Sequence, residues 1–337
     1  MKGYVKRIVL TVLVAILILA LAQLAQAADG TLPVQRVLEG NYCVAYGGVG
    51  LLDGQRHSFG STVEGTPVEA YLYWSARYIG ANNGDSQIRA QINGGGFNQI
   101  SAAARESAYA GFKRDGVEVY YYTYRSANLV GLLPAGGGAL AVAVDRSTTL
   151  EAHGAGLVVI SQGATCSYGQ VQLNFGLDGF FWNFPPDAGP DTQVTCAEFA
   201  AAPTDRTLAM QMYVGGVEHD EMRGDRIWYA TGSGAKPTDI VSGGDPNNVL
   251  DGPPLGENHP PYPLNGSNGD WDTYVNSITV PAGATYACFQ IESIDGRQPV
   301  NGTSGVWVEL LTKLVYEPGL AVLKLTNGND AKLPNDA

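Results

Sequence analysis

The strongest β-strand pattern of the chain is Val117-Glu118-Val119-Tyr120-Tyr121-Tyr122-Thr123-Tyr124. It is almost entirely β-branched and aromatic, a composition that is typical of a β-strand. Because side chains alternate across a strand, Tyr120, Tyr122 and Tyr124 lie on one side, and the valines and Tyr121 lie on the other. Both sides are apolar, so either the strand lies between two layers or one row of tyrosines is exposed.

Similar runs recur along the chain and are separated by turns rich in Gly, Pro and Asn. They cover residues 68–74, 86–92, 138–144, 155–160, 169–175, 208–214, 226–229, 271–280, 284–292 and 305–314. The first of them places Ala70, Leu72 and Trp74 on one face, and Asn93-Gly94 predicts a tight turn. Ala and Glu cluster at 101–112 and Ala at 197–202, which leaves a helix as an alternative there. The pattern predicts an all-β fold, a β-sandwich or jelly-roll-like head built as one large or two fused sandwiches.

The N-terminus predicts export. Lys2, Lys6 and Arg7 precede an apolar run, and Ala25-Gln26-Ala27 is a small-residue cleavage site. The run is about 15 residues long, short of the roughly 20 that span a bilayer. We therefore expect residues 1–27 to be a signal peptide, with an uncleaved N-terminal anchor as the alternative. No second stretch reaches membrane length, so no membrane span is expected after cleavage.

The net charge of the chain excludes two classes of partner. The formal net charge is −12, and removing Lys2, Lys6 and Arg7 makes it −15. A chain this acidic repels nucleic acid and anionic lipid, so neither is an expected partner.

All four cysteines, Cys43, Cys166, Cys196 and Cys288, follow the predicted signal peptide. An even number in an oxidising compartment predicts two disulfides, with three connectivities open. We favour Cys166–Cys196, which would close an insertion, and Cys43–Cys288, which would tie the first strands to the last. No Cys-x-x-Cys pair occurs and no His lies at ligand spacing from a Cys, which disfavours zinc; free buried thiols are the other alternative.

The C-terminus carries a resemblance. An apolar run at 320–326 is followed by an Asn/Asp-rich loop, and Lys324, Thr326, Asn327, Gly328 and Asp330 match the start of DUF11/SdrD B-like Ig-type stalk repeats. Residues 70–75 and 153–159 resemble, more weakly, the uncharacterised β-rich heads that precede such repeats in bacterial and archaeal cell-surface proteins. The resemblance implies a head over 28–318, with an internal boundary near 161–200 as an option, and a truncated Ig-like repeat over 319–337.

Catalytic motifs are weak. No Gly-x-Ser-x-Gly or His-Glu-x-x-His sequence occurs, and the four histidines have unrelated surroundings. A Ser-His-Asp triad assembles in space rather than in sequence, so a hydrolase is the alternative to a non-enzymatic protein. We expect no catalytic residues.

Calcium is the better chemical hypothesis, because turns supply the hard oxygen ligands that it prefers. Asn268, Asp270 and Asp272 lie in an Asn/Gly/Asp-rich turn, and Asp225 belongs to a second acidic group. Asx-turns and an ordinary ion pair explain the same residues equally well.

Aromatic residues supply the candidate ligand or partner sites. An exposed row of Tyr120, Tyr122 and Tyr124 would suit sugar rings, whereas cross-strand pairing inside the fold is the alternative. Trp182 lies in the cluster Phe180–Phe184, which is either a partner-binding loop tip or part of the core. Residues 231–270 form a proline-rich stretch without periodicity, typical of a long surface loop.

These observations predict a non-enzymatic, exported cell-surface protein, an adhesin-like or envelope-structural head. Its partner would be a host, neighbouring-cell or matrix surface protein or glycan. The alternative is a secreted carbohydrate-binding or carbohydrate-active protein that uses the tyrosine row and the 231–272 loop.

Overall fold

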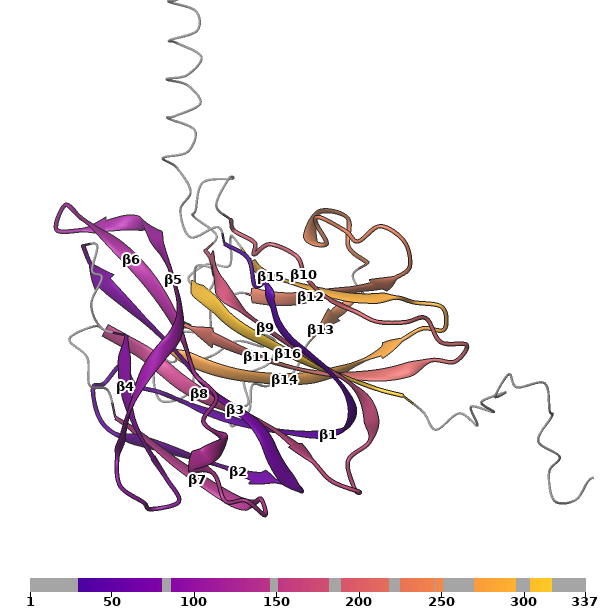
Figure 1. Ribbon diagram of the computed structural model, residues 1–337. Helices are drawn as coiled ribbons and strands as arrows, with labels where there is room; N and C mark the ends of the chain where they lie inside the picture. Colours follow the sequence, from indigo (N-terminus) through magenta and orange to yellow (C-terminus); the bar gives the residue numbers. More distant parts are fainter. Residues whose placement is uncertain are drawn as a thin grey trace, which may run out of the picture.

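The computed structural model describes residues 30–80, 86–145, 151–181, 189–217, 225–245, 247–250, 270–294 and 304–316. These residues form β-strands and two short 3-10 helices (Figure 1), which confirms the predicted all-β class. Within these ranges, no helix is long and apolar enough to cross a membrane.

The elements follow one another along the chain in this order. The first half contains β1 (Val34–Gly50), β2 (His57–Val63), β3 (Thr66–Ile79), β4 (Gln87–Ile92), β5 (Asn98–Arg114), β6 (Val117–Ser126), η1 (Val130–Leu132), β7 (Gly138–Asp145) and β8 (Glu151–Gln162). The second half contains β9 (Tyr168–Phe180), β10 (Thr195–Glu198), β11 (Arg206–Gly215), β12 (Asp225–Gly232), η2 (Val241–Gly243), β13 (Val249–Leu250), β14 (Trp271–Val280), β15 (Tyr286–Ser293) and β16 (Gly305–Val315).

Two long strands join the sheets. Twelve strands form a continuous antiparallel array in the order β14-β11-β16-β9-β1-β8-β3-β6-β5-β4-β7-β2, and β10-β15-β12-β13 form a separate small sheet. The 17-residue β1 pairs with β9 through residues 34–41 and with β8 through residues 42–50. The 17-residue β5 pairs with β4 near its start and with β6 over the rest. The array therefore has three parts: sheet I (β14-β11-β16-β9-β1), sheet II (β1-β8-β3-β6-β5) and sheet III (β5-β4-β7-β2).

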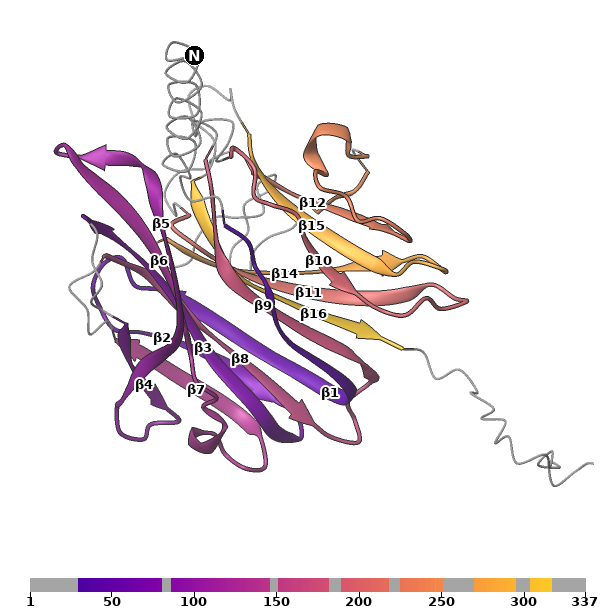
Figure 2. The same ribbon diagram turned by 45° about the horizontal axis from the view of Figure 1, so that its top comes forward.

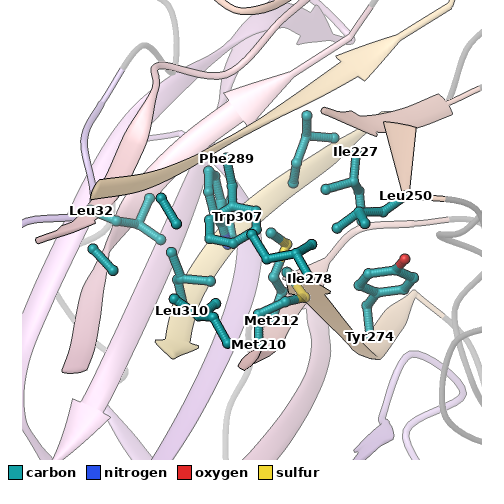
Figure 3. Close-up of a cluster of buried hydrophobic side chains, with 14 of the residues drawn as sticks. Leu32, Met210, Met212, Ile227, Leu250, Tyr274, Ile278, Phe289, Trp307 and Leu310 are labelled. Carbon is teal, nitrogen blue, oxygen red and sulfur yellow. The ribbon is translucent and has the colours of Figure 1, made fainter. Parts of the chain in front are cut away.

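Three apolar cores separate four layers. Side chains of β11, β14 and β16 in sheet I pack against the small sheet, and Figure 3 shows Met210, Trp307 and Phe289 in this core. Side chains of sheets I and II form a second core, and those of sheets II and III form a third. The order of layers is small sheet, sheet I, sheet II and sheet III, and Figure 2 shows β2, β4 and β7 of sheet III at the left and β10, β12 and β15 of the small sheet at the right.

Sheet II lies in the middle, so its strands are buried on both faces. Ala70, Leu72 and Trp74 of β3 all face sheet III, as their spacing predicts. Tyr73, between them in sequence, faces sheet I instead. Double burial explains why the runs of this region are apolar without strict alternation.

The helical alternative for 101–112 is wrong, because these residues lie within β5. Ala104 and Ala108 pack on the core between sheets I and II, and β5 is hydrogen-bonded along β6. Pairing with a neighbouring strand outweighs the local helix propensity of Ala and Glu. At 197–202, β10 ends at Glu198 and the remaining residues are irregular.

Glycines in the central strands let the aromatic rings of sheet I lie directly on sheet II. A Cβ atom on Gly48 would come within 2.6 Å of the Trp271 indole nitrogen, and one on Gly156 would overlap the ring of Tyr213. The Tyr213 hydroxyl lies 2.8 Å from the carbonyl oxygen of Gly47 and 2.9 Å from that of Leu157. Tyr213 thereby joins sheet I to both β1 and β8.

Replacing Gly156 by valine should lower the free energy of unfolding by about 2–3 kcal/mol, because the added side chain and the Tyr213 ring need the same space. Chemical unfolding measures the loss. Gly60→Val is the matched control, since a Cβ there meets only an ordinary contact of 3.6 Å with the Leu140 carbonyl oxygen. Equal stability of the two variants would contradict the close approach of the sheets.

Candidate functional site

The tyrosine row is not an exposed ligand face, contrary to one of the two predictions. Tyr122 and Tyr124 are buried in the core between sheets II and III, where Tyr124 stacks on Trp74 with ring centroids 5.3 Å apart. Tyr120 packs at the edge of the same core, and its hydroxyl donates to Glu118 Oε2 at 2.9 Å. The alternative, aromatic pairing inside the fold, is confirmed, because β6 has a sheet on each face.

The predicted calcium ligands are buried or outside the described residues. Asp225 and Asp272 are fully buried, on β12 of the small sheet and β14 of sheet I respectively. Asp270 is buried, and its carbonyl oxygen accepts the Gly216 N–H at 2.6 Å. Asn268 lies outside the described residues. Among the residues with described positions, no group of three His, Cys, Asp or Glu is suited to a metal ion, so calcium stays a prediction.

The aromatic cluster at 180–184 is only partly described. Phe180 is fully buried in the core beneath the small sheet, and Phe181 packs on the core between sheets I and II. Trp182 lies outside the described residues, as does the apolar run at 320–326. The described part of the cluster belongs to the core.

The predicted disulfide pairing is wrong, although two disulfides form. The bonds are Cys43–Cys166 and Cys196–Cys288. Cys43 lies on β1 opposite the end of β8, and Cys166 lies in the turn that follows β8. Cys196 on β10 is directly opposite Cys288 on β15. The pairing follows from which strands are neighbours, and the spacing of the cysteines does not contain that information.

The described residues form a pocket at the tip of the β5–β6 hairpin. It has a volume of about 200 Å³ and is lined by Arg77, Tyr78, Ile79, Phe112, Lys113, Arg114, Val119 and Glu151. These residues come from the end of β3, the hairpin and the start of β8. The hairpin projects at the upper left of Figures 1 and 2, away from the small sheet. We call this site the hairpin pocket.

Two local backbone features shape the hairpin pocket. Asp115 and Gly116 both have positive φ, 51° and 80°, which is the geometry of a two-residue hairpin turn. A bulge interrupts β5 between Tyr109 and Lys113, with Gly111 at φ 80°. Ala110 is buried in the core while Phe112 is 40% exposed, so the bulge turns the phenyl ring out toward the pocket.

The hairpin pocket has an ordered ion pair and two looser cations. Arg77 donates to both carboxylate oxygens of Glu151, at 2.8 and 2.6 Å. These hydrogen bonds raise the pKa of Arg77 and lower the pKa of Glu151, so both groups stay charged at neutral pH. Arg114 lies 3.8 Å from Glu151 and Lys113 lies 3.9 Å from Glu118, with more than half of each side chain exposed. Lys113 faces Glu118 on the other side of the hairpin, so Arg114 is the cation that a ligand in the pocket can engage.

A buried Ser–His pair lies close to this ion pair. His153 sits at a register shift between β3 and β8, and its Nδ1 is 2.9 Å from Ser75 Oγ. Burial, and secondarily the charge of Arg77, lower the pKa of His153 to about 3, so the imidazole is neutral. A serine bonded to an imidazole is the chemistry of nucleophilic catalysis, but both side chains are fully buried. No substrate reaches this pair in the described conformation.

The hairpin pocket was missed in the sequence, although one signal was present. Asp115-Gly116 between two strand-forming runs is the strongest short-range hairpin signal, and Phe112-Lys113-Arg114 directly precedes it. The helical alternative for 101–112 hid this signal. Arg77 and Glu151 could not have been connected, because their pairing depends on the register of β3 and β8.

Comparison with known proteins gives no family. No family model matches the sequence, and no curated protein matches it significantly. Among solved structures, it is similar to the extracellular domain of ANXUR2 from Arabidopsis thaliana, with 10% identity and a TM-score of 0.25 over 78% of this chain and 82% of that one. It is also similar to the plant receptor-like kinase FER, with 8% identity and a TM-score of 0.23 over 77% and 81% of the two chains. At TM-scores this low, the likeness carries no argument about function.

Proposed function

We propose that this chain is a non-enzymatic protein of the cell surface or the extracellular space, an adhesin-like or envelope-structural head that presents the hairpin pocket. The observation that carries the proposal is the pair of disulfides, each between parts of the chain far apart in sequence, 123 and 92 residues. Such bonds persist in oxidising compartments and are rare in the cytosol. The predicted signal peptide supports the same location.

A surface role fits the construction of the body. Four packed β-layers with three cores form a rigid support, and the hairpin pocket lies at its periphery. Rigid scaffolds with a site at a loop or hairpin tip are typical of binding proteins. The partner would be a host, neighbouring-cell or matrix surface protein or glycan. The burial of Ser75 and His153 gives the hydrolase alternative no support.

Expression of the full chain in a bacterial host, beside a chain lacking residues 1–27, tests the location. We expect the full chain in the extracytoplasmic fraction with all four cysteines protected from a thiol-reactive mass tag, because they are oxidised there. The shortened chain should stay in the cytoplasm and react with the tag. Recovery of the full chain in the cytoplasm with reactive thiols would overturn the proposal.

Carbohydrate binding is the second candidate function. The buried tyrosine row does not support it, but the hairpin pocket combines an exposed phenyl ring with charged hydrogen-bonding groups. This combination is suited to a sugar ring, whose faces are apolar and whose edges are polar.

A further inference from the structure

We infer that the hairpin pocket binds a uronic acid, the carboxylate-bearing sugar unit of an acidic polysaccharide. The inference rests on the proposed function, because a protein outside the cell encounters such polymers. It specifies the ligand of a site formed by β3, the β5–β6 hairpin and β8.

Charge is the first argument. The chain is strongly acidic, with a net charge of −12, yet the lining of the pocket has three cations and one carboxylate. Arg77 is neutralised by Glu151, and Glu118 lies beside Lys113 at 3.9 Å. Arg114 has no shorter ion pair than its 3.8 Å approach to Glu151 among the described contacts. A local excess of positive charge on an acidic protein favours an anionic ligand.

Apolar exposure is the second argument. Seven large hydrophobic side chains are exposed in the described parts of the chain, and three of them, Ile79, Phe112 and Val117, lie on the end of β3 and the hairpin. Ile79 and Phe112 line the pocket itself. The exposure of Phe112 follows from the backbone conformation, because the bulge in β5 buries Ala110 and turns Phe112 outward. The ligand therefore needs an apolar face as well as a negative charge.

Size is the third argument. A volume of about 200 Å³ is smaller than the roughly 300–1,000 Å³ pockets that enclose drug-sized ligands. It suits one sugar ring, with the rest of a polymer extending over the surface.

A uronic acid matches all three features within one unit. Its ring covers Phe112 and Ile79, its carboxylate lies beside Arg114, and its hydroxyls reach the Arg77–Glu151 pair. Glu151 accepts hydrogen bonds from hydroxyls and Arg77 donates them, and the ion pair holds both groups in place. An aspartate or glutamate of a peptide lacks the ring, and inorganic phosphate leaves the apolar side uncovered.

Calorimetric titration of the full chain with oligogalacturonate tests the inference. We expect binding, and at least tenfold weaker binding of the same oligosaccharide after methyl esterification, which removes the charge and keeps the ring. Phe112→Ala and Arg114→Gln should each weaken binding about tenfold, the equivalent of about 1.4 kcal/mol. Arg105→Gln is the matched control, an exposed cation of the same strand outside the pocket, and should bind as the wild type does.

Several results would overturn the inference. They are no binding of oligogalacturonate, equal binding of the methyl ester, competition by inorganic phosphate at the same concentration, or binding to anionic vesicles that Arg114→Gln abolishes. Both pocket substitutions are at exposed positions, so unchanged thermal unfolding separates lost binding from lost folding. Failure of this test leaves the extracytoplasmic location standing, because the thiol and fractionation experiment measures that independently.

Discussion

Replacing Cys196 and Cys288 together by alanine should lower the free energy of unfolding by about 4 kcal/mol. The bond closes a loop of 92 residues, and in the chain-entropy model a loop of that length contributes about 4–5 kcal/mol. The loss should be large because this bond joins β10 to β15, and β10 has no other strand neighbour in the described structure. Denaturant unfolding under non-reducing conditions measures it.

The Cys43→Ala/Cys166→Ala pair is the matched control for the pairing. It removes a bond across a loop of 123 residues, so a similar loss is expected. Each double variant should keep its other disulfide, which peptide mapping without reductant identifies. A peptide linking Cys166 to Cys196, or unfolding that is indifferent to reductant, would contradict the two bonds.

Acid should destabilise the protein through His153. Its pKa is about 3 in the folded state and 6.5 in its usual range, so the unfolded state gains a proton before the folded state does. Above pH 6.5 the imidazole is neutral in both states and does not change the free energy of unfolding. As the pH falls from 6.5 to about 3, the unfolded state binds a proton that the folded state does not, so the free energy of unfolding decreases progressively. The shift corresponds to about 5 kcal/mol at the acid end. The groups facing His153 are Ser75, Tyr121, Arg77 and Glu151.

Two other buried acids change the free energy of unfolding in the opposite direction as the pH falls. The contribution of His153 is therefore measured by comparing variants with the wild type. Burial, with Glu292 and Asp239 nearby, raises the pKa of Asp191 to about 7, and burial raises the pKa of Glu309 well above its usual range. For both carboxyl groups, stability rises as the pH falls toward the unfolded value. Unfolding curves of His153→Gln from pH 7 to 3 should lack the loss that the wild type shows, whereas Ser75→Ala keeps the imidazole and should retain it. Parallel curves for His153→Gln and the wild type would refute the role of His153.

Local sequence patterns were enough for the strands, because a strand needs only its own composition and its turns. The run at 271–280 coincides with β14, and the run at 117–124 lies within β6. Ala70, Leu72 and Trp74 share a face as alternation requires. These features depend on a two-residue period that any strand must have.

The number of layers could not be predicted from such patterns. A strand with two apolar sides is compatible with an exposed row or with burial on both faces, and only the position of β6 between sheets I and III decides for Tyr122 and Tyr124. The disulfide pairing likewise depends on which strands are neighbours in the fold. Cys196 meets Cys288 because β10 lies beside β15, a neighbour relation between segments 92 residues apart.

The hairpin pocket is partly predictable from local sequence patterns and partly not. Its turn at Asp115-Gly116 is a local signal, and its apolar and basic residues are adjacent to that turn. Its ion pair is not local, since Arg77 and Glu151 meet through strand register. The Asp115-Gly116 turn signal is therefore enough to predict the apolar and basic residues of the hairpin, and not the ion pair.

The sharing of β1 between sheets I and II has a consequence for how the molecule acquires its structure. β1 is the first strand of the described chain, but its partners are β8 and β9, and β9 is completed on its other side only by β16, the last described strand. Native pairing thus links the first and last strands of the described residues, and topologies dominated by such distant pairings fold in milliseconds to seconds rather than microseconds. For a chain exported as proposed, pairing that needs the last described strand favours folding after that strand has passed through the membrane.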